Sequence, residues 1–298
     1  MCKPVLLACD WGTTNLRAWT LDAAGAVVAE KDFSLGVSKL APGEAASRFE
    51  SEVRPGLDAT GLPAILCGMI GSNLGWTTVP YADCPAGLAD LAASLTVVAD
   101  GVRIVPGLRC DGLAGAPDVM RGEETQVLGW LAQHPERRAG RHLVCHPGTH
   151  AKWVLVEDGR IARFVTAMTG ELFAVLGRHS LLRSEAPADD AAAFDEGLAA
   201  AGRGDALAAR LFTARARVVG GKAESDSTPS YLSGLLIGAE VASVPGLLGE
   251  APKHVALLGA AGLCARYRRA LERIGVAVEA FDGEVAAIGG LFALGAPP

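Results

Sequence analysis

The hydrophobic pattern of the chain alternates between short apolar runs and longer stretches of helical periodicity. Apolar runs bounded by turn residues predict strands at 5–10, 16–22, 26–33, 64–67, 97–105, 142–145, 153–156, 160–167, 254–258 and 276–281. Helical spacing predicts helices at 43–56, 123–133, 170–182, 188–201, 205–217, 261–275 and 284–294, and a further helix that begins at Thr228 and Pro229. Strands and helices interleaved in this way indicate an α/β chain.

Part of this pattern repeats. The segment CDWGTTNLRAWTLDAAG, residues 9–25, aligns with CHPGTHAKWVLVEDG, residues 145–159. Cysteine falls on cysteine and Gly-Thr on Gly-Thr and, with a two-residue gap, tryptophan falls on tryptophan and turn glycine on turn glycine. Each copy follows an apolar strand and heads a strand, hairpin, helix and strand series. The repeat predicts two related domains facing one another across a cleft, with chance similarity of two hairpins as the alternative. The Gly- and Pro-rich stretch 107–117 is the expected junction, which divides the chain into 1–117 and 118–298.

Both copies place glycine and threonine at a hairpin turn. Such a turn exposes backbone N–H groups and hydroxyls with little side-chain bulk, which suits an anionic phosphate. The phosphate-binding candidates are Gly12, Thr13, Thr14, Gly148 and Thr149. Asp10 could hold a magnesium ion, because hard divalent cations prefer carboxylate oxygen. The alternative is that Asp10 and Thr13 merely cap a tight turn.

Composition limits the partners and the compartment. The 298 residues carry 27 Lys and Arg against 33 Asp and Glu, a net charge of −6, which argues against a nucleic-acid groove or an anionic membrane face. The seven cysteines form no CxxC pair, and neither a signal peptide nor an apolar run near the length of a membrane span is recognised. We therefore expect a soluble cytoplasmic protein.

Several motifs carry a family resemblance. Asp-x-Gly-Thr-Thr, the second Gly-Thr hairpin and the late glycine pairs are similar to the sugar kinase, Hsp70 and actin superfamily. More closely, CDWGTTNLRAW, GMIGSNLGW, RGEETQ, HPGTHAKWV and TGELFAVL resemble the 2-dehydro-3-deoxygalactonokinase family, in the same order and over essentially the whole chain. The resemblance implies an actin-like ATPase architecture, with two ribonuclease-H-like domains of mixed sheets flanked by helices. It also implies ATP- and Mg²⁺-dependent transfer of the γ-phosphoryl group to the 6-hydroxyl of 2-dehydro-3-deoxy-D-galactonate, a reaction of galactonate catabolism.

The expected chemistry assigns roles near the two turns. Asp10 is the magnesium-associated carboxylate, because His146 stands where the superfamily often has an aspartate and imidazole is a poor magnesium ligand. Lys152 could supply a charge to phosphate or be an exposed strand residue. A general base should be a carboxylate at the domain junction, where RGEETQ offers Glu123 and Glu124. Adjacent helical residues point about 100° apart, so only one should reach the cleft, and Glu123 is favoured. Alternatively, both complement the helix dipole.

Substrate groups are expected chiefly in the first half, as the domain that binds substrate and phosphate. The substrate-binding candidates are Asn15, Arg17, Gly36, Ser38, Ser72, Asn73 and Trp76. The Arg17 guanidinium matches the carboxylate of a sugar acid, whereas Ser38 and Trp76 could equally serve loop packing. The second half should bind the nucleotide, with Gly259 and Gly262 admitting adenosine, although tight strand–helix packing explains both glycines as well.

Other functions of this fold class stay open. One is a carbohydrate kinase that acts on a neutral hexose or an amino sugar. Another is a non-catalytic sugar sensor, which would usually carry an added DNA-binding helix-turn-helix, and no room for one is visible before the first strand. Sugar acid and ATP are the expected partners, nucleic acid and membrane are not expected, and a homodimer is left open.

Overall fold

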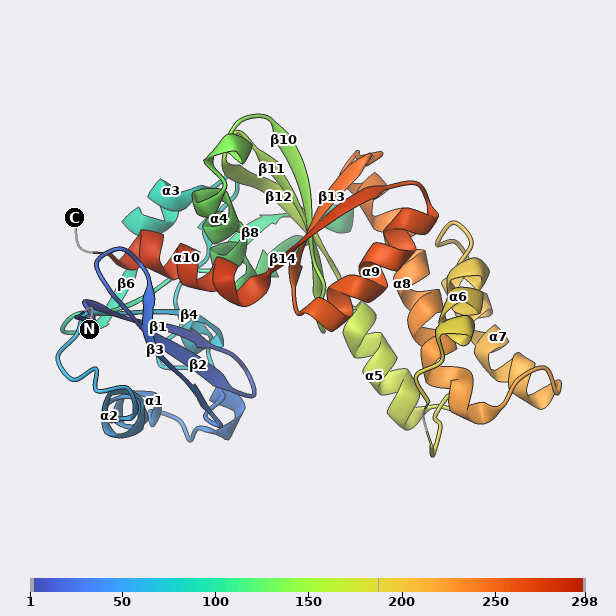
Figure 1. Cartoon of the computed structure of the whole chain (residues 1–298), viewed down its shortest axis with the longest axis horizontal. Helices are drawn as coiled ribbons and strands as arrows, with labels where there is room; N and C mark the ends of the chain where they lie inside the picture. Colours follow the sequence, from blue (N-terminus) through green and yellow to red (C-terminus); the bar gives the residue numbers. More distant parts are fainter. Residues whose placement is uncertain (1–2, 187, 297–298) are drawn as a thin grey trace. The chain divides into compact units, whose positions relative to one another are not determined.

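The computed structural model describes residues 3–186 and 188–296 and confirms the α/β class (Figure 1). The chain separates into two compact units, which are described one at a time. Unit 1 contains the described residues of Met1–His142, Leu155–Arg163 and Asp282–Pro298, and unit 2 contains those of Leu143–Val154 and Phe164–Phe281. These discontinuous units differ from the continuous division at 117/118, because unit 1 also takes in the helix after residue 122 and the last helix of the chain.

Unit 1 is built on a mixed six-stranded sheet with the order β3-β2-β1-β4-β7-β6. Its strands are β1 (Leu6–Trp11), β2 (Leu16–Leu21), β3 (Val27–Phe33), β4 (Ala64–Gly68), β6 (Thr96–Ala99) and β7 (Val102–Ile104). β1 is antiparallel to β2 and parallel to β4. The single strand predicted over 97–105 is wrong: β6 and β7 are an antiparallel pair, because Gly101 takes a positive φ and turns the chain.

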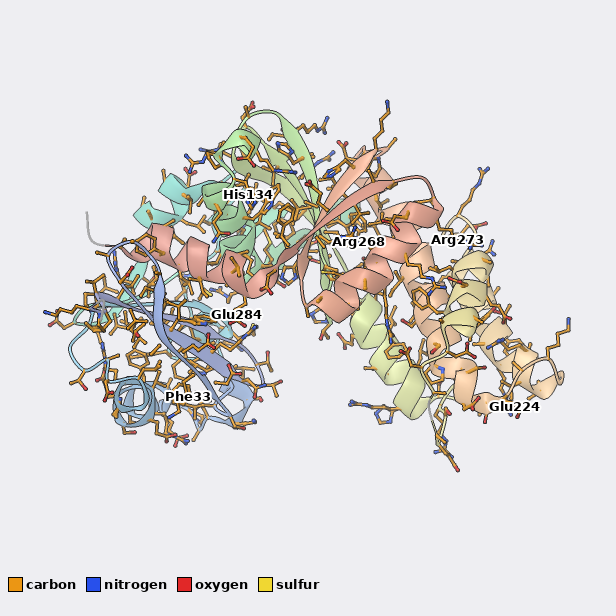
Figure 2. The ribbon with its side chains drawn as sticks, viewed as in Figure 1. Phe33, His134, Glu224, Arg268, Arg273 and Glu284 are labelled. Atoms are coloured by element: carbon orange, nitrogen blue, oxygen red, sulfur yellow. The ribbon has the colours of Figure 1, made fainter. Side chains whose placement is uncertain are left out.

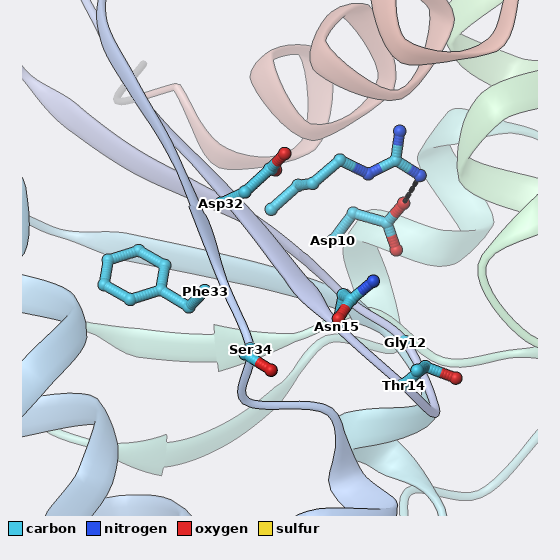
Figure 3. Close-up of a pocket in the computed structure, with 8 residues that line it drawn as sticks. Asp10, Gly12, Thr14, Asn15, Asp32, Phe33 and Ser34 are labelled. Atoms are coloured by element: carbon cyan, nitrogen blue, oxygen red, sulfur yellow. Dashed lines mark hydrogen bonds and ion pairs between the residues drawn. The ribbon is translucent and has the colours of Figure 1, made fainter.

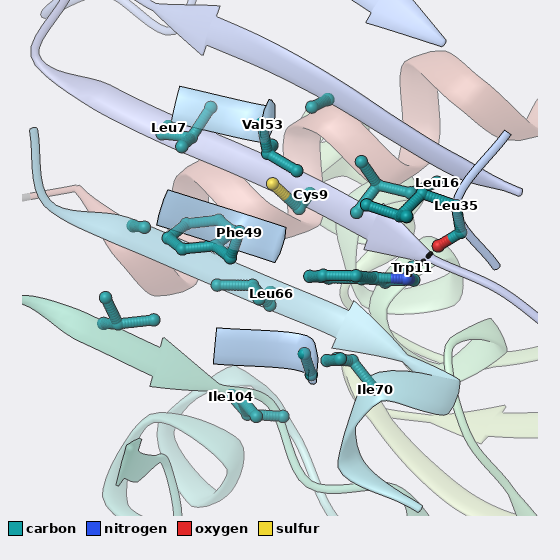
Figure 4. Close-up of a cluster of buried hydrophobic side chains, with 14 of the residues drawn as sticks. Leu7, Cys9, Trp11, Leu16, Leu35, Phe49, Val53, Leu66, Ile70 and Ile104 are labelled. Atoms are coloured by element: carbon teal, nitrogen blue, oxygen red, sulfur yellow. Dashed lines mark hydrogen bonds between the residues drawn. The ribbon is translucent and has the colours of Figure 1, made fainter. Parts of the chain in front are cut away.

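A helical segment covers one face of this sheet. It consists of α1 (Ala45–Arg48), a π-helical turn (Phe49–Val53) and α2 (Arg54–Gly56). Phe49 has no exposed surface and packs in one cluster with Trp11 and Leu66 from the sheet (Figure 4). The indole N–H of Trp11 donates to the carbonyl of Leu35, so the loop after β3 is tied to the end of β1.

Two helices, α4 (Glu123–Gln133) and α10 (Gly283–Gly295), cross closely in unit 1. A Cβ atom at Gly129 would lie 1.9 Å from the Ala286 carbonyl oxygen, and one at Gly290 would lie 2.1 Å from that of Thr125. Neither helix can therefore carry a side chain at the crossing point. This close contact fixes the start of α4, on which Glu123 and Glu124 lie.

A second, three-stranded sheet with the order β5-β8-β9 was not predicted. Its strands are β5 (Ala82–Asp83), β8 (Leu108–Asp111) and β9 (Pro117–Met120), and the short helix α3 (Leu88–Ala93) was also missed. β8 occupies much of the stretch 107–117, which was expected to be a junction, and pairs in antiparallel fashion with β9.

A third sheet has five strands in the order β12-β11-β10-β13-β14. Its strands are β10 (Arg141–His146), β11 (Ala151–Glu157), β12 (Arg160–Ala167), β13 (His254–Gly259) and β14 (Ala277–Asp282). This order matches β3-β2-β1-β4-β7 strand for strand, which agrees with the internal repeat. His142 and His146 lie on β10, and His150 lies in the loop between β10 and β11.

Unit 2 contains the helices α5 (Thr169–His179), α6 (Ala191–Ala200), α7 (Leu207–Val219), α8 (Thr228–Leu247) and α9 (Ala261–Arg273). α8 is central and packs against α5, α6, α7 and α9. By length and composition alone, Ser225–Leu247 could cross a membrane, so the expectation that no apolar run reaches that length is wrong. However, 78% of its most apolar window is buried inside the protein, which is the environment of a core helix.

The close crossing of α4 and α10 predicts that adding a single methyl group there strongly lowers the stability of the protein. Gly129→Ala should lower the free energy of unfolding by about 1–3 kcal/mol, because backbone atoms must move apart to admit the Cβ. Denaturant unfolding followed by circular dichroism measures it. Gly177→Ala in α5 is the matched control, since no atom lies within 4 Å of its Cβ position and alanine favours a helix. An unchanged midpoint for Gly129→Ala would contradict the close crossing.

Candidate active site

The first Gly-Thr loop is the turn between β1 and β2, and the segment after β3 holds it in place. The Gly12 N–H donates to the Asn15 carbonyl at 2.9 Å. The Ser38 hydroxyl donates to the Thr13 carbonyl at 2.7 Å, and the Gly36 N–H donates to the Thr14 carbonyl at 3.2 Å. Gly36 and Ser38 thus brace the loop, and a contact of either with substrate stays a prediction.

A cavity of about 620 Å³ opens beside this loop (Figure 3). It is lined by Asp10, Gly12, Thr14, Asn15, Arg17, Asp32, Phe33 and Ser34. Sequence reasoning found the first five of these residues and missed the last three, which lie at the end of β3 and just beyond it. The structure thus brings the predicted magnesium carboxylate, phosphate loop and sugar-acid groups to one cavity in unit 1.

Arg17 links two carboxylates at this cavity. Its guanidinium lies 3.4 Å from Asp10 and 3.4 Å from Glu284, which is in the first turn of α10 (Figure 2). Burial raises the pKa of Asp10, the Arg17 charge opposes that rise, and the Glu123 carboxylate adds to it. Asp10, Arg17 and Glu123 are therefore electrostatically coupled.

The start of α4 reaches this group through close backbone contacts. A Cβ at Gly68, the last residue of β4, would lie 3.2 Å from Asp10 Oδ1, and one at Gly122 would lie 3.3 Å from the Gly68 Cα. Both glycines also take a positive φ. The ends of β1 and β4 and the start of α4 can meet only because these two positions carry no side chain.

The two adjacent glutamates have different environments. Glu124 has no exposed surface and accepts hydrogen bonds from the Gly122 N–H at 2.7 Å and the Thr125 hydroxyl at 3.0 Å. Burial, followed by the charge of Glu123, raises the pKa of Glu124 to about 8. Glu123 is half-buried and accepts a hydrogen bond from the Arg121 N–H at 3.0 Å. Only Glu123 is both partly accessible and coupled to Asp10, which supports it as the candidate base.

The GMIGSNLGW loop is mainly held by its own contacts. The Ser72 hydroxyl donates to the Met69 carbonyl at 2.7 Å, and the Trp76 ring packs 5.6 Å from that of Phe49. Asn73 is exposed. Arg121, which sequence reasoning missed, donates to the Val79 carbonyl at 2.8 Å next to this loop. Its place in RGEETQ, directly before the candidate bases, was the signal available.

The second Gly-Thr loop lies in unit 2, between β10 and β11. The Thr149 carbonyl accepts from the N–H of Glu171 at 2.9 Å, and the imidazole of His150 hydrogen-bonds the Glu171 carboxylate. The start of α5 therefore supports this loop. Lys152 is only 4% exposed, so the alternative of an exposed strand residue is wrong.

A cavity of about 470 Å³ adjoins the second loop. It is lined by Pro147, Gly148, Thr149, Thr169, Gly170, Phe173, Ser233, Leu236, Ile237, Ala260, Leu263, Arg266 and Tyr267. Gly259 and Gly262 are not in this lining, although their neighbours Ala260 and Leu263 are. Sequence reasoning missed the helical members because their apolar spacing is that of ordinary core residues.

The family model for 2-keto-3-deoxy-galactonokinase matches residues 10–294, a range that contains both Gly-Thr loops and the start of α4. The chain belongs to this family. It is 40% identical over 296 residues to a "Probable 2-dehydro-3-deoxygalactonokinase" of Rhizobium meliloti (strain 1021), covering 96% of this chain and 95% of the relative. It is 38% identical over 283 residues to the 2-dehydro-3-deoxygalactonokinase of Escherichia coli (strain K12), covering 94% of each chain.

A solved structure is also similar over the whole chain. The crystal structure of a candidate 2-dehydro-3-deoxygalactonokinase from Sinorhizobium meliloti superposes with a TM-score of 0.84 at 38% identity, covering 97% of both chains. The family resemblance is confirmed, and so is an α/β architecture of mixed sheets flanked by helices.

The buried Glu124 predicts a pH-dependent stability. Its pKa rises from 4.5 to about 8 on folding, so the folded state binds more protons between these values. The stabilisation is complete below about pH 4.5 and is lost as the pH rises toward about 8. Glu124→Gln should make this decline shallower, as measured by the thermal midpoint at several pH values. Glu136→Gln, at an exposed position, should retain the decline. A Glu124→Gln profile parallel to that of the parent would contradict the assignment.

Proposed function

We propose that the chain is a sugar-acid kinase of the cytoplasm that transfers the γ-phosphoryl group of ATP to the 6-hydroxyl of 2-dehydro-3-deoxy-D-galactonate in galactonate catabolism. The observation that carries the proposal is the family match over residues 10–294, together with relatives of 40% and 38% identity named as this kinase. Free thiols at all six described cysteines are consistent with a reducing compartment.

ATP is the phosphoryl donor, and we assign its adenosine to the cavity in unit 2. Phe173 and the apolar residues of α8 offer a surface for a base, and Ser233 and Arg266 offer polar contacts. Gly148 and Thr149, at the same cavity, are assigned to the phosphates, with the charge of Lys152 nearby on β11. Gly259, which takes a positive φ, would then act by turning the chain before α9, whereas Gly262, whose Cβ position is open, stays a candidate for contact with adenosine.

In unit 1, Gly12, Thr13 and Thr14 are also assigned to phosphate. Asp10 is assigned to Mg²⁺, which would neutralise phosphate charge. The described residues contain no group of three or more His, Cys, Asp or Glu suited to a metal. This composition fits Mg²⁺, since that ion commonly takes one or two carboxylates and completes its shell with water and substrate phosphates.

The sugar acid is assigned to the cavity of unit 1. Asn15 and Arg17 line it, and a guanidinium can donate two parallel hydrogen bonds to a carboxylate. Ser72, Asn73 and Trp76 are retained as candidates for the sugar hydroxyls. Glu123 is proposed to accept the proton of the attacking hydroxyl, and the neighbouring Glu124 to hold the start of α4 through the Gly122 N–H.

The base assignment predicts a clear difference between neighbouring substitutions. Glu123→Gln should lower kcat by about 10²–10⁴-fold, the usual contribution of a general base, with little change in the KM for ATP. Glu124→Gln should retain most of the activity at pH 7, because Glu124 already carries a proton below about pH 8. Steady-state ADP release measures both. A loss confined to Glu124→Gln would move the base by one position.

Substrate class is tested on the unmodified protein. In a coupled ADP-release assay with Mg²⁺ and ATP, 2-dehydro-3-deoxy-D-galactonate should be turned over faster than any member of a panel of neutral hexoses and amino sugars. The physical reason is the Arg17 guanidinium at the cavity, because a neutral sugar has no carboxylate to form an ion pair with it. Turnover confined to neutral sugars would reject the galactonate assignment. Failure of every sugar in the panel to produce ADP would favour a non-catalytic sugar sensor.

A further inference from the structure

One buried carboxylate in unit 2 has no part in the roles assigned above. Glu240, on α8, is 4% exposed. Its Oε1 accepts a hydrogen bond from the Trp153 indole N–H at 2.7 Å, and its Oε2 accepts one from the Tyr267 hydroxyl at 2.8 Å. The Thr169 side chain hydrogen-bonds the same carboxylate. The three donors lie on different elements, β11, α9 and the first residue of α5.

Two of these donors belong to the cavity beside the second Gly-Thr loop. Thr169 and Tyr267 line it, as do Leu236 and Ile237 of α8. Residues three and four apart share one face of a helix, so Glu240 follows Leu236 and Ile237 on the face that borders the cavity. The carboxylate is therefore placed directly behind the cavity wall and is joined to it by hydrogen bonds.

Burying the Glu240 carboxylate costs free energy of desolvation. The three partners of Glu240 described above are neutral donors, and burial of a carboxylate among them carries a large desolvation penalty. Burial raises the pKa of Glu240, while the three hydrogen bonds oppose that rise. Apolar side chains would fill the same volume without this penalty. A fully satisfied network instead fixes each donor in one position, which apolar packing does less well.

The same hydrogen bonds reach the phosphate loop. Thr169 is followed by Gly170, where an added Cβ would lie 2.4 Å from the Gly148 carbonyl oxygen and 2.7 Å from the Thr149 Cα. The Glu171 N–H donates to the Thr149 carbonyl. The position of Thr169 therefore sets where the start of α5 meets the loop. Trp153 ties in β11, the strand that leaves the loop.

We propose that Glu240 is a positioning residue for the nucleotide: by fixing Tyr267, Thr169 and Trp153, it sets the shape of the cavity and the place of the Gly148–Thr149 loop. The inference rests on the proposed assignment of this cavity to ATP. Glu240 contacts no substrate in this scheme and acts through its three donors.

The test is Glu240→Gln, which preserves volume but replaces one acceptor oxygen by an NH₂ donor and so mispairs at least one of the three donors. The KM for ATP and the Kd for ADP from titration calorimetry should rise about tenfold or more, the scale of one hydrogen bond to a charged group. The KM for the sugar acid should stay within about twofold. Tyr267→Phe removes one donor only and should give a smaller change of the same kind.

Ser243→Ala is the matched control. Ser243 lies one turn further along α8 and donates to the Ala239 carbonyl at 2.7 Å, so its loss removes a hydrogen bond from the same helix without touching the cavity. It should leave the KM for ATP unchanged. If Glu240→Gln does not fold, Tyr267→Phe and Trp153→Phe carry the test, and nucleotide affinity equal to the parent in both would reject the proposal.

The outcomes separate the two levels of the argument. If the parent protein binds no ADP, the assignment of a nucleotide to this chain fails. If the parent binds ADP and folded Glu240→Gln binds it equally well, the positioning role fails and the assignment stands. Equal rises in the KM values for ATP and sugar acid would indicate general destabilisation and would also reject the positioning role.

Discussion

The close approach of three backbone segments at the end of β1 is the constraint on which the candidate site in unit 1 depends. Asp10 stands opposite Arg17 on the antiparallel neighbour and opposite Cys67 on the parallel neighbour. Gly68 and Gly122 then leave no side chain between Asp10 and the start of α4. A carboxylate can be half-buried here because the Arg17 guanidinium lies beside it and opposes the rise in its pKa that burial and the Glu123 carboxylate cause.

The parts of the fold that could be predicted from the sequence are those with a clear local pattern. The bounds of α4 at 123–133 and β12 at 160–167 agree with those expected, because both have a clear period and sharp turn residues at their ends. The sheet β5-β8-β9 was missed because strands of two to four residues within Gly- and Pro-rich sequence carry too few alternating positions to be recognised. Its strands β5 and β8 pair although α3, β6 and β7 separate them in the sequence, so no local window contains both.

Site residues follow the same division. Asp10, near the end of β1, and Gly148, in the loop after β10, stand out because their types are unusual at the end of an apolar strand. Phe173, Tyr267 and Glu240 could not be distinguished, since each fits the periodicity of its helix. Only the packing of α5, α8 and α9 brings Phe173 and Tyr267 to one cavity and places Glu240 behind its wall. Glu123 could be favoured over Glu124 because it is closer to Gly122 and the helix start, but the complete burial of Glu124 depends on packing that the sequence does not display.

The two sheets share one strand order, yet their buried carboxylates are used differently. In unit 1, Asp10 and Glu123 keep part of their surface, and Asp10 lies beside the Arg17 guanidinium. In unit 2, Glu240 is buried and accepts hydrogen bonds from the neutral donors Trp153 and Tyr267. A buried carboxyl group surrounded by hydrogen-bond donors is a poor ligand group but fixes the positions of those donors, because moving any of them leaves a polar atom unsatisfied. The repeat thus preserves a loop and a topology, while the chemistry of each half is set by which helix packs behind its loop.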